Sequence, residues 1–317
     1  MHNPMTASIR ILGLIALSVS ITGCATSDLN PSDLAYFQPD IVSTEVRPLG
    51  SYSIYHNTVH IGLSEMKPIV PSFDGKGNLI ASWNPHPAGI QGRPTIVIVH
   101  GGHGIVPTDF ATAAWAAKEL NANTLVLDSY WSRGIQENWR TQTRFGVDMR
   151  ALDSIAAGKW LQAQGVDKQK IFLMGGSQGG WTVLRTFTQT PFMEKNAKGI
   201  YRAGISLYPN CNSKGMRDDP TLGPYWGKVI VFTGGKDTAT PPSACPSRVF
   251  TDATSWIHYP EATHGWDVAN RGAHTSAVDG DCGRALNVYN RFSVCRSDSV
   301  TADMYEKIKA FVADVTR

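Results

Sequence analysis

The chain has 317 residues, of which 42% are hydrophobic and 17% charged, with 30 Gly and 18 Pro. This composition allows a sizeable core between many turns and excludes wholesale disorder, collagen and coiled coil. The net charge is +3 and the basic residues are dispersed, so nucleic acid is not expected as a partner, because phosphate backbones are bound by clustered basic residues.

The N-terminal segment has the features of an export signal. Residues 1–23 contain one charged side chain, Arg10, followed by an apolar run over residues 11–22. This run is shorter than the ~20 residues that a membrane-spanning helix needs. The sequence Ile21-Thr22-Gly23-Cys24 at its end resembles the bacterial lipobox, in which small residues precede a lipidated Cys. We therefore expect residues 1–23 to be a lipoprotein signal peptide. The alternative is an ordinary cleaved signal with Cys24 as an incidental thiol.

A lipidated Cys24 would attach the protein to a membrane without crossing it. Each buried CH₂ of the acyl chains contributes about 0.8 kcal/mol. The expected location is the bacterial cell envelope, either the outer membrane facing the periplasm or the cell surface. Residues 24–50 have scattered Ser, Asp, Asn and Pro and no sustained period, which indicates a tether. We expect one folded domain over residues 51–317.

The other cysteines agree with export. They are Cys211, Cys245, Cys282 and Cys295, an even number, and in an oxidising compartment they predict two disulfides. Three pairings are possible. We favour Cys211–Cys245 with Cys282–Cys295, because each pair brackets a loop near the predicted site. No Cys-x-x-Cys or His-Glu-x-x-His motif is present, so we expect no metal centre.

From about residue 78 short β-branched runs alternate with longer helical periods. This alternation predicts an α/β fold with a mostly parallel sheet and helices on both faces. The expected strands are residues 95–99, 124–128, 171–174, 203–208, 228–233 and 255–259, and the expected helices are residues 108–120, 143–164, 181–188 and 302–315. The connection between residues 208 and 228 is too short for a large lid domain, so we expect an open pocket.

The motif Gly175-x-Ser177-x-Gly179 has the spacing of a nucleophile elbow, in which a strained turn between a strand and a helix exposes a serine. The alternative is a Gly-rich turn with an unreactive serine. The surrounding sequence favours the elbow, because an apolar strand precedes it and a helix follows. An earlier strand ends in a loop, His100-Gly101-Gly102-His103-Gly104, of the kind that supplies a backbone N–H to an oxyanion hole. We expect the two donors to be the N–H of Gly102, or of His103 as second choice, and that of Gln178.

Such a serine needs a base, and the base needs a carboxylate to orient it. Asp237 follows the strand at residues 228–233, at the strand end where open α/β sheets place their sites. It is preferred to Asp252, which lies in or near a helix. His264 follows the next strand and completes the order Ser, acid, His. His258 lies inside that strand and is less suited, as is His274 in a long loop.

These motifs resemble the α/β-hydrolase fold and, within it, the dienelactone hydrolase family. The resemblance covers residues 78–317 and is carried by His100-Gly101-Gly102, residues 128–134, residues 175–180, Gly235-Lys236-Asp237 and Thr263-His264-Gly265. Two positions depart from the family, since dienelactone hydrolase has a cysteine nucleophile where Ser177 stands and a glutamate where Gly101 stands. These departures favour hydrolysis of ordinary carboxylic esters over hydrolysis of dienelactone. The resemblance implies small-molecule ester or lactone substrates, no cofactor and no metal.

The expected activity is ester or lactone hydrolysis through Ser177, His264, Asp237 and an acyl-enzyme. One alternative is a peptidase of the prolyl-oligopeptidase type, and another is a non-catalytic envelope lipoprotein that uses the fold for binding. The long connection at residues 267–301 is expected to form a cross-linked rim over the site, together with Trp131, Trp181 and Trp266. Arg133 could bind a substrate carboxylate or form an internal ion pair.

Overall fold

The fold was analysed in a computed structural model of the chain. It describes residues 66–133, 135, 146–211, 224–246, 253–267, 280, 282–286 and 291–317. The predicted signal peptide, Cys24 and the tether lie outside these residues, as do Asp252 and His274. No helix within the described ranges combines the length and apolar character needed to cross a bilayer.

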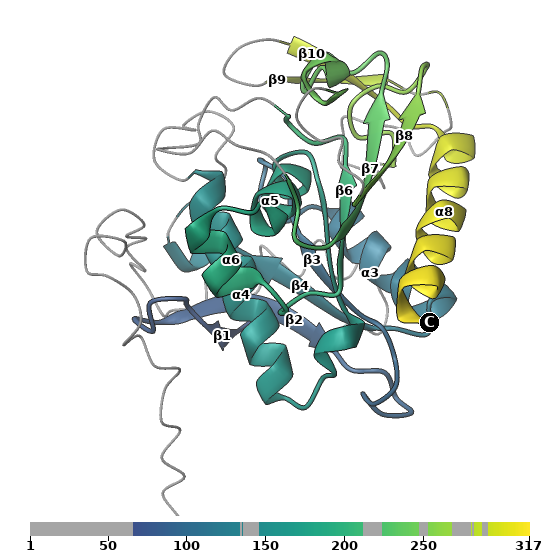
Figure 1. The fold of residues 1–317 in the computed structure, drawn as a ribbon. Helices are drawn as coiled ribbons and strands as arrows, with labels where there is room; N and C mark the ends of the chain where they lie inside the picture. Colours follow the sequence, from purple (N-terminus) through teal and green to yellow (C-terminus); the bar gives the residue numbers. More distant parts are fainter. Residues whose placement is uncertain are drawn as a thin grey trace, which may run out of the picture.

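The core of the protein is an 8-stranded sheet with the order β1-β2-β4-β3-β5-β6-β7-β8 (Figure 1). β2 is antiparallel to β1 and β4, whereas the pairs from β4 to β8 are parallel. The strands are β1 Lys67–Pro71, β2 Asn78–Asn84, β3 Thr95–Val99, β4 Asn123–Asp128, β5 Ile171–Gly176, β6 Ala203–Leu207, β7 Lys228–Gly234 and β8 Thr254–Tyr259. β3, β4 and β6 are buried at every residue, which explains their apolar runs, since parallel strands are covered on both faces.

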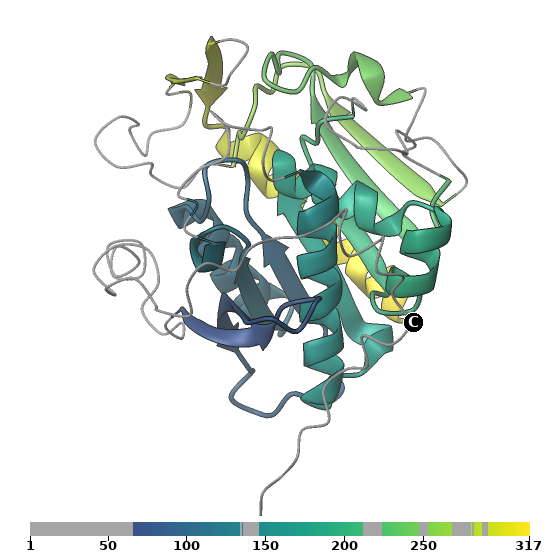
Figure 2. The same cartoon turned by 90° about the vertical axis from the view of Figure 1, so that its left-hand side faces the viewer.

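Helices cover both faces of this sheet (Figures 1 and 2). They are α3 Pro107–Glu119, α4 Val147–Ala163, α5 Gln178–Phe187, α6 Pro191–Ala197 and α8 Asp298–Thr316. Apolar side chains of α4, α5 and α6 pack with Val97 and Val99 on one face. Those of α3 and α8 pack with Ile96 and Ile98 on the other. Alternate residues of one strand therefore enter two separate cores, as the strand period of 2 requires. The predicted fold class is confirmed.

Sequence periodicity missed several elements. β1, β2 and α6 were not predicted, and part of the expected loop at residues 267–301 is a two-stranded hairpin of β9 Cys282–Leu286 and β10 Arg291–Cys295. Short 3-10 helices lie at Trp131–Arg133, Lys168–Lys170 and Pro242–Ala244. α8 begins four residues earlier than expected, because the Ser297 side chain accepts a hydrogen bond from the Val300 N–H and caps the helix.

Both disulfides have the favoured pairing, Cys211–Cys245 and Cys282–Cys295. The second joins residues that face each other across the β9–β10 hairpin. The first links the segment that follows β6 to the 3-10 helix that follows β7. Each cross-link therefore restrains a segment at the carboxyl end of the sheet.

The strand order reverses at β3, because β4 lies on one side of β3 and β5 on the other. The loops that leave β3 and β5 therefore diverge above the sheet and leave a crevice between them, which is where open α/β sheets bind ligands. The start of α5 lies very close to β3, since a Cβ at Gly179 would stand 2.2 Å from the Val99 carbonyl oxygen. Only glycine fits there.

We expect Gly179→Ala to destabilise the protein by about 3 kcal/mol, because its methyl group would overlap backbone that cannot move aside. This exceeds the ~1 kcal/mol by which Ala is normally preferred to Gly in a helix. Urea unfolding measures the change. Gly101→Ala is the matched control, because a Cβ there meets nothing closer than 3.6 Å. Equal stability of the two variants would contradict the prediction.

Candidate active site

Ser177 stands in a strained turn between β5 and α5. Its φ is 57° and its ψ is −118°, a conformation that residues with a side chain rarely adopt. The turn is held by the Ser177 N–H, which donates to the Leu207 carbonyl at 2.9 Å, and by the Ser177 carbonyl, which accepts from the Trp181 N–H at 3.0 Å. The turn places Ser177 in the wall of a cavity rather than in the sheet. This is the geometry of a nucleophile elbow.

The other two predicted residues meet Ser177 from neighbouring strand ends. His264 Nε2 lies 2.9 Å from Ser177 Oγ, and His264 Nδ1 lies 2.8 Å from Asp237 Oδ2. Both side chains are buried. A carboxylate can only accept hydrogen bonds, so Asp237 favours the tautomer with the proton on Nδ1 and leaves Nε2 free to accept the hydroxyl proton. The structure thus brings together three residues from separate parts of the sequence, of which Ser177 and His264 are 87 positions apart.

Asp237 is itself held in place by the turn that follows it. Its Oδ1 accepts from the Ala239 and Thr240 N–H groups at 2.9 and 2.8 Å, and its Oδ2 accepts from the Thr240 hydroxyl at 2.8 Å. These donors fix the plane of the carboxylate. The Thr240 hydroxyl oxygen also lies 3.1 Å from His264 Nδ1. The sequence pointed to Asp237 through its place after a strand but did not indicate Thr240.

Two aromatic rings contact the imidazole edge-on. Tyr208 lies 4.9 Å from it and Phe292 5.2 Å, measured between ring centroids. Phe292 belongs to β10 of the disulfide-linked hairpin. The hairpin is tied to the chain beside His264, because the Cys295 N–H donates to the Thr263 hydroxyl at 2.8 Å. This part of the expected rim is therefore present, and Phe292 is the rim residue that the sequence did not single out.

A cavity of about 150 Å³ opens in front of Ser177 and His264. The glycine loop (residues 100–104) forms one wall, and Gly102, His103 and Gln178, the predicted sources of oxyanion donors, all line it. The loop lies close to the serine, since a Cβ at Gly101 would be 3.6 Å from the Ser177 Cβ. Gly102 and Gln178 are thus at the wall of the same cavity as the serine.

Of the three tryptophans expected at the rim, only Trp181 lines this cavity. Trp266 is fully buried against the rings of Tyr208 and Tyr259. Trp131 packs at the edge of the α3–α8 core. Packing therefore accounts for both Trp131 and Trp266.

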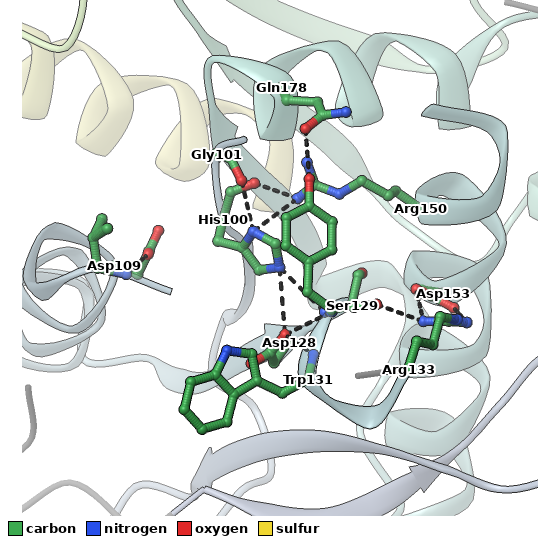
Figure 3. Close-up of polar contacts among 12 residues, drawn as sticks. His100, Gly101, Asp109, Asp128, Ser129, Trp131, Arg133, Arg150, Asp153 and Gln178 are labelled. Atoms are coloured by element: carbon green, nitrogen blue, oxygen red, sulfur yellow. Dashed lines mark hydrogen bonds and ion pairs between the residues drawn. The ribbon is translucent and has the colours of Figure 1, made fainter. Parts of the chain in front are cut away.

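Arg133 does not face the cavity. Its Nη1 and Nη2 donate to the two carboxylate oxygens of Asp153 at 2.9 and 2.7 Å, and both side chains are buried (Figure 3). Nη1 also donates to the Ser129 carbonyl at 2.7 Å. Of the two readings of Arg133, the internal ion pair is the one present in the structure.

Two acidic residues that the sequence did not indicate also line the cavity, Asp109 on α3 and Asp267 after β8. Burial raises the pKa of Asp109 to about 7, and the nearby charge of Asp267 acts in the same direction. Its Oδ2 accepts from the Val106 N–H at 2.8 Å, which opposes this rise. Among the described residues, no group of three His, Cys, Asp or Glu could hold a metal ion.

No protein-family model and no curated protein matches this sequence. Solved structures do match. One is a protein of Klebsiella pneumoniae subsp. pneumoniae assigned provisionally as a dienelactone hydrolase, with 14% identity, a TM-score of 0.54, and coverage of 80% of this chain and 97% of that chain. Another is Thermogutta terrifontis esterase 2 phosphorylated by paraoxon, with 16% identity, a TM-score of 0.55, and coverage of 81% and 95%. The chain has the α/β-hydrolase fold. Within that class, the structure is similar to those of a dienelactone hydrolase and an esterase.

The raised pKa of Asp109 predicts a stability change with pH. The unfolded carboxyl has a pKa near 3.9, so from about pH 4 to 7 the folded state binds more protons and stability falls as pH rises. We expect Asp109→Asn to remove this loss. The free energy of unfolding of the variant minus that of wild type should therefore be about 2–4 kcal/mol higher at pH 8 than at pH 4.5. Urea unfolding at the two pH values measures it.

The matched control is Asp167→Asn, because Asp167 also accepts a backbone hydrogen bond, from Gln169, but is exposed. It supplies the baseline for replacing a hydrogen-bonded carboxylate by an amide. A pH-independent effect of Asp109→Asn would show that Asp109 is not held in its protonated form.

Proposed function

We propose that this protein is a serine hydrolase that cleaves carboxylic esters or lactones. The observation that carries the proposal is the unbroken hydrogen-bond series from Asp237 through His264 to Ser177 at the wall of a cavity. A serine hydroxyl is a weak nucleophile at neutral pH, and this arrangement supplies the base that it needs. The fold supports the proposal, since the similar structures include an esterase and a dienelactone hydrolase.

The reaction follows from the placement of these groups. His264 Nε2 accepts the hydroxyl proton while Ser177 Oγ attacks the carbonyl carbon, and the Gly102 and Gln178 N–H groups bind the resulting oxyanion. Asp237 stabilises the imidazolium. When the ester C–O bond breaks, His264 returns the proton to the leaving alcohol and an acyl-enzyme remains. Water, deprotonated by His264, then attacks the acyl carbon, and the acid leaves as Ser177 recovers its proton.

The size of the cavity favours short acyl groups. A volume of about 150 Å³ is comparable to an apolar cavity that holds one benzene molecule in another protein. The walls are mixed, with Ile98, Met174 and Phe292 beside polar groups. Short acyl esters, small aryl esters and small lactones fit this description better than long-chain lipids.

The site of action that we propose is the bacterial cell envelope. The lipobox-like Ile21-Thr22-Gly23-Cys24 and the preceding apolar run support a lipid anchor on Cys24. The two disulfides support an oxidising compartment, since such bonds persist mainly outside the cytosol. A small-molecule substrate would then reach the enzyme in the periplasm or at the cell surface.

Ser177→Ala is expected to lower kcat for short-chain p-nitrophenyl esters by about 10⁴-fold or more, because the covalent step is lost. Labelling by a fluorophosphonate should disappear with it. Ser154→Ala is the matched control, since Ser154 is buried in α4 and hydrogen-bonds to Thr186. Full esterase activity in Ser177→Ala would overturn the proposal.

A substrate panel separates the remaining candidates. Hydrolysis of acetyl and butyryl esters or small lactones, with decanoyl esters turned over poorly, supports the proposed function. Cleavage of aminoacyl anilides without cleavage of esters would identify a peptidase. A wild-type protein that hydrolyses none of these substrates and is not labelled by a fluorophosphonate would favour a binding protein.

Cys24→Ala is expected to abolish incorporation of a labelled fatty acid and to move the protein from the membrane fraction to the aqueous fraction of an expressing bacterium. The physical reason is the loss of the acyl chains, each of which contributes about 0.8 kcal/mol per buried CH₂. Cys282→Ser should keep the label. A label that persists in Cys24→Ala would place lipidation elsewhere or exclude it.

A further inference from the structure

Arg150 on α4 is a buried arginine that forms no direct ion pair with a carboxylate of the described residues, although its charge acts on the buried Asp109 and Asp153. Its side chain is fully buried, and within the described part of the chain its Nε and Nη1 have no hydrogen-bond partner. The other buried arginines are paired, Arg133 with Asp153 and Arg185 with Asp148. An unpaired buried charge is costly, so the position of Arg150 calls for a physical explanation.

Among the described residues, the hydrogen-bond partner of Arg150 is His100, at the start of the glycine loop. Its Nη2 donates to the His100 carbonyl oxygen (Figure 3) and lies 3.4 Å from His100 Nδ1. His100 directly follows β3 and begins the loop that carries Gly102. The guanidinium therefore fixes the point from which the proposed oxyanion loop departs.

The His100 side chain also restrains the next peptide, between Gly101 and Gly102. Its Nε2 accepts from the Ser129 N–H at 3.2 Å, so the ring proton lies on Nδ1, which donates to the Gly101 carbonyl at 2.7 Å. Burial, aided by the charge of Arg150, lowers the pKa of His100 and keeps it neutral. The peptide whose carbonyl is held in this way is the one that carries the Gly102 N–H.

Tyr130 connects Arg150 to Gln178, the residue that carries the second proposed donor. The Arg150 guanidinium lies over the Tyr130 ring, 5.3 Å from its centroid. The Tyr130 hydroxyl donates to Gln178 Oε1 at 2.6 Å. Figure 3 shows Arg150 between His100 and Gln178, beside the elements that carry both donors.

We propose that Arg150 is a positioning residue for the oxyanion hole, whose buried positive charge orients the glycine loop and stabilises the negative charge that develops beside Ser177. This inference rests on the proposed function. Because Arg150 is not among the residues that line the described cavity, it acts through the His100 peptide and through its positive potential, which the dry interior screens only weakly. Its contribution should therefore appear in the transition state and not in substrate binding.

The test compares Arg150→Met and Arg150→Lys with wild type, once wild type has been shown to hydrolyse p-nitrophenyl acetate. Loss of one direct oxyanion donor lowers kcat by about 10²–10³-fold. Arg150 acts one step removed, so Arg150→Met should lower kcat by about 10–100-fold with KM changed less than about 3-fold. The affinity for an aryl trifluoromethyl ketone, whose adduct with serine carries an oxyanion, should fall by the same factor. Arg150→Lys should recover part of both losses.

Arg185→Met is the matched control, because it also removes a buried guanidinium but not one that contacts the glycine loop. Each variant is compared per active site, counted by fluorophosphonate labelling, so that unfolded protein does not enter the rates. If Arg150→Met does not fold, Arg150→Lys carries the test, with a fall of about 3-fold or more in both kcat and ketone affinity expected. The inference is overturned if Arg150→Met has the same ketone affinity and kcat as Arg185→Met. It is also overturned if, in the case where Arg150→Met does not fold, Arg150→Lys has the ketone affinity and kcat of wild type. An inactive wild type would instead overturn the proposed function.

Discussion

The close approach of α5 to the carboxyl ends of β3 and β5 is the constraint on which the site depends. A Cβ at Gly175, Gly179 or Gly180 would stand within 2.7 Å of backbone atoms of neighbouring elements. Because these residues have no side chains, the turn at Ser177 can be sharp enough to require a positive φ. The same approach brings the serine against the glycine loop, so one steric condition determines both the exposure of the hydroxyl and its distance from the backbone donors.

The polar groups around this turn are arranged as two networks with different physical character. On one side Asp237 and His264 form a chain of hydrogen bonds that ends at the serine hydroxyl. On the other side Arg150, His100 and Tyr130 support the loop and Gln178 (Figure 3). The first network can exchange a proton, whereas the second is neutral or fixed in charge. This separation fits a reaction in which a proton moves to one side of the serine while negative charge develops on the other.

Part of the rim of the cavity is a hairpin that carries a disulfide. Of the hairpin side chains that the structure describes, Phe292 and Val294 are buried in a small cluster, and a two-stranded hairpin alone is marginally stable in water. The Cys282–Cys295 disulfide and the contacts with Thr263 hold it beside His264. A disulfide in this wall agrees with the oxidising location proposed for the protein.

The sequence by itself determined the local features of this protein. Runs of β-branched residues predicted the parallel strands, and the glycines around Ser177 predicted the turn, because each depends on steric preferences within a few residues. Positions after strand ends also indicated Asp237 and His264. Only the tertiary structure decided which distant side chains lie around the site, namely Asp109 and Phe292 in the wall of the cavity and Arg150 behind the glycine loop. Their roles depend on the distances and burial that packing imposes between separate elements, and neither periodicity nor motif spacing contains that information.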